Sequence, residues 1–169
     1  MLRQLYQEAQ EKFGKDTEEM NYFWEVVGKQ DSINELAVIA IIEEYGWPGI
    51  SLVGGKANLT VWLVIQHADV ELQEKYLPLL KASVAEGESQ GGNLALLEDR
   101  ILMYRGKPQR YGSQTRANPE TGVQEVYPVE DPEYVNQRRA AVGLGPIEPY
   151  LERFGIEWTV PQQERPTKD

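Results

Sequence analysis

Polar residues that could do chemistry follow directly after the longest apolar run of the chain. That run is Leu59–Ile65, and Gln66, His67 and Asp69 come after it. His67 is the only histidine, and because imidazole titrates near neutrality it is the natural general acid or base. The alternative is a hydrogen-bonded structural histidine at the end of a helix. We treat His67 as a candidate catalytic residue and keep both interpretations open.

Asp69 also has two interpretations. A carboxylate near a histidine could orient the imidazole, which makes Asp69 a second catalytic candidate. Residues two apart on one helix point in different directions, so direct pairing with His67 within a helix is disfavoured. An aspartate just before a new helix suits the N-cap position, and the sequence favours that role.

Five more side chains could bind a substrate beside His67: Gln66, Arg100, Gln109, Tyr111 and Gln114. Glutamine amides suit the recognition of amides, sugars or bases, and arginine can hold a carboxylate or a phosphate. Each residue also has a structural alternative. Asp99 and Arg100 could form buried ion pairs with other elements, and Tyr111 could be a half-buried aromatic residue of a hairpin.

Gln109 and Gln114 pose a geometric problem for a shared site. On a regular strand they face opposite sides of the sheet, because side chains alternate along a strand. They reach one pocket only if Gly112 makes a β-bulge. A shared site therefore predicts an irregular backbone at that glycine.

Several chemistries are excluded by what the sequence lacks. With no cysteine and one histidine, the common zinc sites and a cysteine nucleophile are absent, and no carboxylate cluster has a recognisable metal-ligand spacing. Gly54-Gly55-Lys56 invites a phosphate-loop reading, but the first glycine of that motif would fall at Ile50. No G-x-S-x-G elbow is present. We therefore expect no metal and no cofactor.

The composition indicates one globular domain over residues 1–160, followed by a flexible tail at 161–169. The net charge of −10 argues against a nucleic-acid partner. No segment approaches the about 20 apolar residues that a membrane span needs, and the start does not resemble a signal peptide. We therefore expect no membrane partner and a cytoplasmic protein.

The spacing of apolar residues predicts mostly helices. Lys56 to Ala68 contains β-branched residues that favour a strand, but its length and lack of alternation favour a buried helix. The other helix predictions depend on capping and stop signals. They cover residues 1–13, a helix capped by Asp16 and closed by Gly28, Ile33 to Tyr45 after Ser32, a helix after Asp69 bent or divided at Pro78, an Asn93-capped helix to Arg105, a helix starting at Asp131-Pro132, and Pro146 to Phe154.

Gln109 to Arg116 and Val123 to Val129 are predicted to form a β-hairpin, with turn residues between them. A lone hairpin is marginal in water, so it must pack on the helices. The predicted fold class is therefore α+β, mainly α: a helical bundle with one small β-hairpin packed against it.

Several short motifs lie along the chain from residue 46 onward. They are Gly46-Trp47-Pro48, Val53-Gly54, Gln66-His67-Ala68-Asp69, Asn93-Leu94-Ala95, Asp99-Arg100, Gly106-Lys107-Pro108-Gln109, Tyr111-Gly112-Ser113-Gln114, Asp131-Pro132 and Arg138-Arg139-Ala140. Taken together, these motifs resemble an uncharacterised bacterial family, a domain of unknown function. The resemblance covers roughly residues 31 to 152, and Ser113 stands where threonine is expected. It implies a fold and a set of candidate site residues, and it brings no activity.

Two functional hypotheses follow. In the first, the protein is a small-molecule enzyme, a hydrolase or lyase, that uses His67 as general acid/base in a cleft lined by glutamine and tyrosine. In the second, it is a non-catalytic module that binds a ligand or another protein, and the polar cluster is structural. An open cleft with a reachable His67 favours the first, and a filled, hydrogen-bonded cluster favours the second. The expected ligand is a small molecule or a peptide, and the sequence leaves the oligomeric state open.

Overall fold

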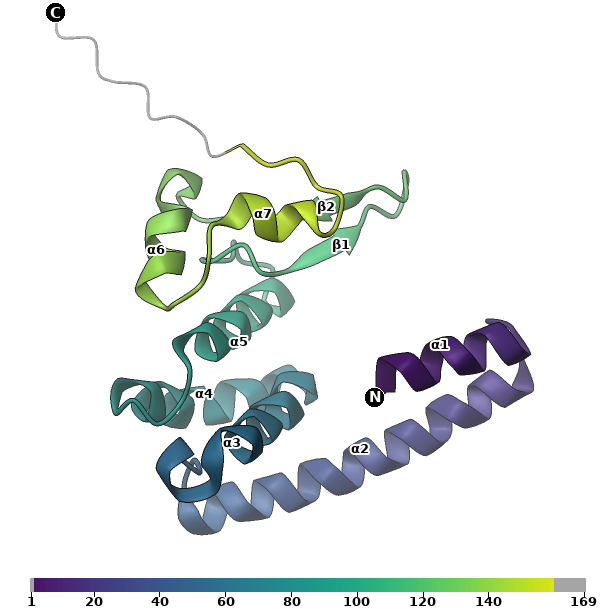
Figure 1. Ribbon diagram of the computed structural model, residues 1–169, viewed down its shortest axis with the longest axis horizontal. Helices are drawn as coiled ribbons and strands as arrows, with labels where there is room; N and C mark the ends of the chain where they lie inside the picture. The colour runs from purple at the N-terminus through teal and green to yellow at the C-terminus, as the bar shows by residue number, and fades with distance from the viewer. Residues whose placement is uncertain (1, 160–169) are drawn as a thin grey trace, which may run out of the picture. The chain divides into compact units, whose positions relative to one another are not determined.

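The computed structural model describes the backbone of residues 2–159 and the side chains of residues 5–159. The chain divides into two compact units, with the boundary between Gly46 and Trp47 (Figure 1). Each unit is described by itself. The prediction of one domain over 1–160 stays a prediction, and the predicted tail at 161–169 lies outside the described residues.

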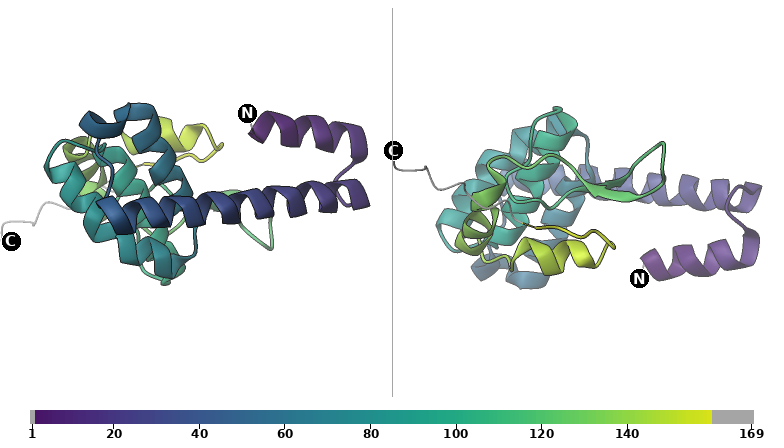
Figure 2. Two further views of the ribbon diagram at one scale, coloured as in Figure 1. Left: turned by 90° about the horizontal axis from the view of Figure 1, so that it is seen from below. Right: turned by 90° about the horizontal axis from the view of Figure 1, so that it is seen from above.

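The first unit is a helical hairpin. α1 (Leu2–Phe13) and α2 (Glu18–Tyr45) run antiparallel and side by side (Figure 2). The ring centroid of Tyr6 on α1 lies 6.5 Å from that of Phe23 and 5.2 Å from that of Trp24 on α2. Aromatic contacts therefore hold the two helices together at this end.

α2 is one helix where the sequence predicted two, so the predicted break at Gly28 and Ser32 is wrong. A glycine inside a helix costs only about 1 kcal/mol relative to alanine, which tertiary and local contacts can offset. Lys29 pairs with Glu25 at 2.6 Å, and Ser32 Oγ donates to the carbonyl of Gly28 at 3.0 Å. These contacts between residues four apart bridge the glycine. The N-cap is Thr17, not Asp16.

The second unit begins with three consecutive helices, α3 (Ile50–His67), α4 (Val70–Ala85) and α5 (Gly91–Tyr104), and α4 packs on both of the others. The preference for a helix over a strand at Lys56 to Ala68 is confirmed. α3 begins earlier than predicted and contains a backbone break at Gly54, whose φ of 79° and ψ of 157° suit glycine alone.

The N-cap predicted for α4 is confirmed, and the N-cap predicted for α5 is wrong. The Asp69 carboxylate accepts from Leu72 N at 2.8 Å, so its predicted N-cap role is confirmed. α4 then runs through Pro78 without being divided. α5 begins at Gly91 with Gln90 as N-cap, so the predicted cap at Asn93 is wrong. The Asn93 carbonyl instead accepts from the indole Nε1 of Trp62 at 2.9 Å.

A buried amide that the sequence analysis did not single out joins two loops of this unit. Asn58 on α3 is 2% exposed. Its Nδ2 lies 2.9 Å from the carbonyl of Pro48, 3.2 Å from the carbonyl of Glu88 and 2.9 Å from Ser89 Oγ. One side chain thus fixes the segment before α3 to the segment before α5, beside the backbone hydrogen bond from Ile50 N to the Glu88 carbonyl.

The rest of the second unit is a short hairpin and small helices. β1 (Thr115–Ala117) pairs antiparallel with β2 (Gln124–Val126), so the strands are shorter than predicted. Then come the 3-10 helix η1 (Pro132–Tyr134), α6 (Val135–Ala141) and α7 (Ile147–Glu152). Val135, Ile147 and Leu151 are fully buried, and β2 reaches this core through Val126. The fold class, α+β and mainly α, is confirmed.

No helix in the described part of the chain combines the length and the apolar character that crossing a lipid bilayer requires.

The continuity of α2 predicts the sign of a glycine substitution. Gly28 is exposed with open space at its Cβ position, so Gly28→Ala should stabilise the protein by about 0.5–1 kcal/mol. Gly14→Ala is the matched control, because its φ of +86° should make alanine destabilising by a similar amount. Urea unfolding followed by circular dichroism measures both. Destabilisation by Gly28→Ala would show that the helix ends there after all.

Candidate functional site

The segment 109–114, here called the glutamine loop, is closed by its own two glutamines. Gln109 Oε1 accepts from Gln114 N at 2.9 Å, and Gln109 Nε2 donates to the carbonyls of Gln114 and Tyr127 at 3.1 and 2.9 Å. Gln114 Nε2 donates to Ser113 Oγ at 3.0 Å. Both glutamines are buried, so these amides serve the loop itself.

Gly112 makes the loop possible. Its φ is +66°, and a Cβ at this position would lie 2.2 Å from Cδ1 of Ile147. Only a glycine satisfies both the backbone conformation and the close approach of α7. The irregular backbone predicted at Gly112 is therefore present, in a loop instead of a bulged strand. It brings Gln109 and Gln114 together, but the Gln109 amide binds the backbone of Gln114.

Asp99 on α5 binds one side of the loop. Its carboxylate is fully buried and accepts three backbone N–H groups, from Arg110 at 2.7 Å, Tyr111 at 3.0 Å and Ser113 at 2.9 Å. Burial raises the pKa of the Asp99 carboxyl, and the three N–H groups act in the opposite direction. Asp99 thus binds backbone amides where an ion pair with another element was one prediction.

The other side of the loop is held by α6 and α7. Arg138 Nε, Arg139 Nη1 and the Tyr150 hydroxyl donate at 2.7, 2.6 and 2.7 Å to the loop carbonyls. Those carbonyls belong to the same three residues whose N–H groups Asp99 binds: Arg110, Tyr111 and Ser113. We call Asp99, Arg138, Arg139 and Tyr150 the loop clamp. The loop clamp therefore binds both the N–H and the C=O of these three residues.

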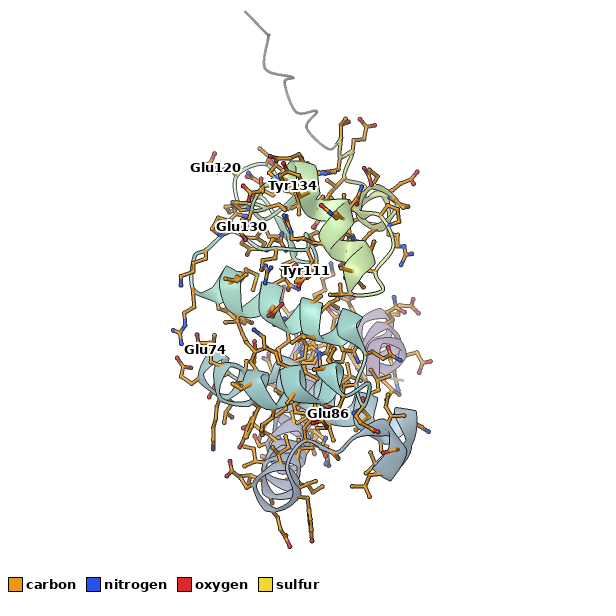
Figure 3. All side chains as sticks on the ribbon, turned by 90° about the vertical axis from the view of Figure 1, so that its left-hand side faces the viewer. Glu74, Glu86, Tyr111, Glu120, Glu130 and Tyr134 are labelled. Carbon is orange, nitrogen blue, oxygen red and sulfur yellow. The ribbon has the colours of Figure 1, made fainter. Side chains whose placement is uncertain are left out.

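The hydroxyl of Tyr111 binds another side chain of the protein. In Figure 3 Tyr111 lies between α5 and the α6–α7 segment. Its hydroxyl donates to Glu98 Oε2 at 3.2 Å, and the other oxygen of Glu98 pairs with Lys81 at 2.7 Å. Burial and the nearby Glu98 carboxylate raise the pKa of the Tyr111 hydroxyl, which favours its neutral form. These contacts support the structural alternative for Tyr111.

Gln66 and His67, neighbours at the end of α3, lie in different surroundings. Gln66 is buried and His67 is exposed. The Gln66 carbonyl accepts from Arg100 Nη1 at 2.8 Å and from Gln73 Nε2 at 3.3 Å. Arg100 therefore joins α5 to the end of α3 through a main-chain oxygen, a structural use of its charge. Catalysis by His67 with Asp69 stays a prediction.

The cleft with the most suggestive chemistry lies elsewhere in the second unit. It has a volume of about 640 Å³, and its lining includes residues of the α5 start and of the α6–α7 segment. Its two charged lining residues are Arg139 and Arg153. Val142 and Leu144 form an apolar part of its wall. His67, Gln109, Tyr111 and Gln114 are not among its lining residues.

Two glycines shape this cleft. A Cβ on Gly91 would lie 3.0 Å from the carbonyl of Val142, and one on Gly92 would lie 3.0 Å from Leu144 Cδ2. The missing side chains let the α6–α7 link approach the first turn of α5. That turn contains no acidic residue, and Gln90 caps it without a side-chain hydrogen bond. The N-terminal peptide dipoles of α5 therefore face this region without a neutralising carboxylate of their own.

Arg139 connects the cleft to the loop clamp. It is 3% exposed, its Nε donates to the Gly145 carbonyl at 2.6 Å, and its guanidinium lies 4.9 Å from the ring centroid of Tyr150. Burial lowers the pKa of this guanidinium, but an arginine in a protein keeps its charge. Arg139 thus places a fixed positive charge at the wall of the cleft.

Sequence reasoning missed most residues of the cleft. Arg139 stood within the Arg138-Arg139-Ala140 motif, which was the available signal, but no role was assigned to it. Gly91 and Gly92 lay just before the helix that was predicted to start at Asn93, and Arg153 carried no signal. These positions become related only when α5 and α7 come together.

The fold and the polar network define a small, mainly helical α+β protein whose second unit is organised around a clamped loop. The chain belongs to a family of unknown function, DUF6624, whose sequence model matches residues 3–158. The resemblance to a domain of unknown function is confirmed at this level. No curated protein and no solved structure matches the chain.

The clamp predicts a difference between two aspartates under the same substitution. Asp99→Asn replaces one acceptor oxygen by an N–H₂ group facing a backbone N–H, so the free energy of unfolding should fall by about 1–3 kcal/mol. Asp69→Asn is the control, because asparagine caps a helix as well as aspartate and the change should stay within about 0.5 kcal/mol. Urea unfolding of both variants measures the difference. Equal effects would mean that the clamp does not hold the second unit together.

Proposed function

We propose that this protein is a non-catalytic binding module for a small anionic ligand, with the ligand held in the cleft between the start of α5 and the α6–α7 segment. The observation that carries the proposal is the charge of the lining: in a chain of net charge −10, the cleft has two charged lining residues and both are arginines. Such a site attracts a carboxylate or a phosphate.

The hydrogen bonds of the glutamine loop support a module over an enzyme. Gln109, Gln114 and Tyr111 were expected to line a catalytic cleft, and their polar groups bind the protein instead. A filled, hydrogen-bonded cluster is what the second functional hypothesis requires. In this proposal the loop has a positioning role, because it receives Arg139 and Tyr150 and so fixes the wall of the cleft.

The cleft also suits the size and polarity of a ligand with an anionic group and an apolar body. Its volume of about 640 Å³ falls within the usual range of small-molecule sites. Arg139 is fixed by three contacts with the protein, so little side-chain entropy is lost when an anion binds. Arg153 is exposed and supplies a second, adaptable charge.

The test is titration of the full chain with phenyl phosphate, inorganic phosphate and the neutral analogue benzyl alcohol, measured by calorimetry and by the shift in melting temperature. Phenyl phosphate should bind more tightly than benzyl alcohol. Arg153→Gln should weaken phenyl phosphate by about tenfold, or 1.4 kcal/mol, because a charge-assisted hydrogen bond is lost.

The matched control is Arg116→Gln, an exposed arginine on the hairpin that pairs with Glu125 and does not line the cleft. It makes the same change in net charge and should leave the affinity unchanged. If both variants weaken phenyl phosphate equally, or if benzyl alcohol binds as well as phenyl phosphate, the cleft is not an anion site.

A further inference from the structure

α2 has apolar residues on two faces. Met20, Val38 and Ile42 lie on one face and are buried. A second row of large apolar side chains is exposed: Tyr22 at 68%, Val26 at 46%, Ile33 at 60% and Leu36 at 68%. An ordinary surface helix has a single apolar stripe, so the second face requires an explanation.

The exposed row has the spacing of a coiled coil. It continues through Lys29 and Ala40, and its members follow one another in alternating steps of four and three residues: Tyr22, Val26, Lys29, Ile33, Leu36 and Ala40. That alternation is the heptad pattern by which one helix packs along another. We call these six positions the heptad face.

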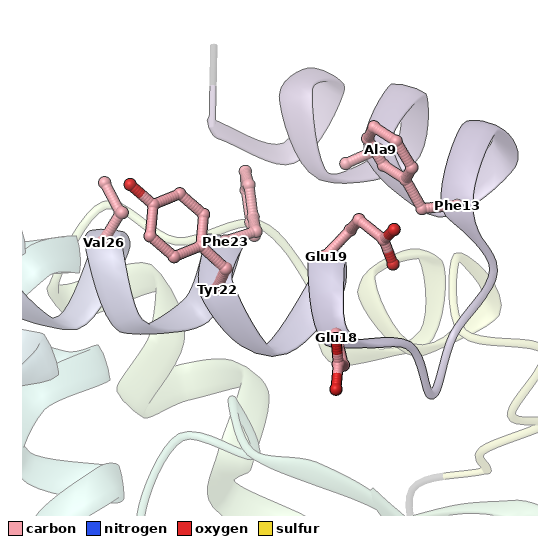
Figure 4. A pocket seen from close by; sticks show the side chains of 7 residues that line it. All are labelled: Ala9, Phe13, Glu18, Glu19, Tyr22, Phe23 and Val26. Atoms are coloured by element: carbon pink, nitrogen blue, oxygen red, sulfur yellow. The ribbon is translucent and has the colours of Figure 1, made fainter.

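A groove lies at the N-terminal end of the heptad face. Tyr22 and Val26 lie next to one another on α2, and Ala9 and Phe13 of α1 lie across from them (Figure 4). The groove has a volume of about 510 Å³, enough for a large apolar side chain of a partner helix. Its two charged lining residues are Glu18 and Glu19.

The charges of α2 decide which partner fits. The helix contains seven acidic residues and one basic residue, and Lys29 is already paired with Glu25 at 2.6 Å. A second copy of α2 would bring the same negative charge to the interface, whereas a basic helix would be attracted to it. The acidic residues are Glu18, Glu19, Glu25, Asp31, Glu35, Glu43 and Glu44.

We propose that the heptad face is a docking surface for a basic amphipathic helix of another protein. The partner helix presents apolar residues at heptad spacing to Tyr22, Val26, Ile33 and Leu36. Lysine or arginine residues on its flanks face Glu18, Glu19 and Glu25, the carboxylates that lie beside Tyr22 and Val26 on α2. This surface uses no residue of the anion cleft and is independent of the proposed function.

The test uses two fluorescent synthetic peptides of about three heptads, each with leucine at the core positions, one with lysine and one with glutamate at the flanking positions. Anisotropy titrations are made against the full chain. The lysine peptide should bind, and the glutamate peptide should bind at least about tenfold more weakly, because like charges would then face each other. Glu18→Gln with Glu19→Gln should weaken the lysine peptide without changing any apolar residue.

Ile33→Ser with Leu36→Ser should weaken the lysine peptide by about tenfold or more, since two exposed apolar side chains no longer pack on it. The matched control is Leu52→Ser, which removes a 76% exposed leucine of the second unit and should not affect binding. All of these positions are exposed, so the variants should fold, which circular dichroism verifies.

Three results would overturn the proposal. The serine variants could bind the lysine peptide as well as the wild type does. Binding would then depend on net charge alone and not on the apolar side chains of the heptad face. The two peptides could bind equally, which would remove the charge argument. Light scattering could show a wild-type dimer that Ile33→Ser with Leu36→Ser converts to a monomer, which would assign the heptad face to a second copy of this chain.

Discussion

The second unit depends on one buried carboxylate. Asp99 accepts the N–H groups of Arg110, Tyr111 and Ser113, and this capture of backbone donors fixes a loop that has no regular secondary structure. A buried loop is otherwise costly, because each unpaired peptide group loses its hydrogen bonds to water. Arg138 and Arg139 on α6 and Tyr150 on α7 donate hydrogen bonds to the carbonyls of the same loop residues. The loop is therefore bound both to α5 and to the α6–α7 segment.

In this arrangement, polar residues of types that are common in binding sites bind groups of the protein itself. Glutamine, tyrosine and arginine are common in binding sites, and the same side chains are also the best partners for buried peptide groups. In this chain the side chains of Gln109 and Arg100 bind backbone atoms, and the Gln114 amide binds Ser113 Oγ. In the proposed function the ligand binds in the cleft instead, where Arg139 belongs both to the loop clamp and to the wall.

The fold was predictable from the sequence to a large extent. The helical period and the Asp69 cap placed α4, and the long apolar run correctly indicated a helix at 56–68. The break predicted at Gly28 was wrong because glycine only weakens a helix, and contacts four residues apart compensate for it. The hairpin was shorter than predicted because the N–H groups of Arg110, Tyr111 and Ser113 bind the Asp99 carboxylate. Only the two ends of the loop, Gln109 and Gln114, bind backbone atoms of residues 127–130.

The sequence by itself determined the helical character, the fold class and the identity of the suspicious polar residues, since local spacing and capping depend on near neighbours along the chain. Only the tertiary structure decided what those residues do. Asp99 and the clamp arginines, like Gly91 and Arg153, are separated by tens of positions, and a carboxylate or guanidinium takes its role from whichever groups surround it after folding. Hydrogen-bond partners and local charge are properties of that three-dimensional neighbourhood, and periodicity along the chain does not encode them.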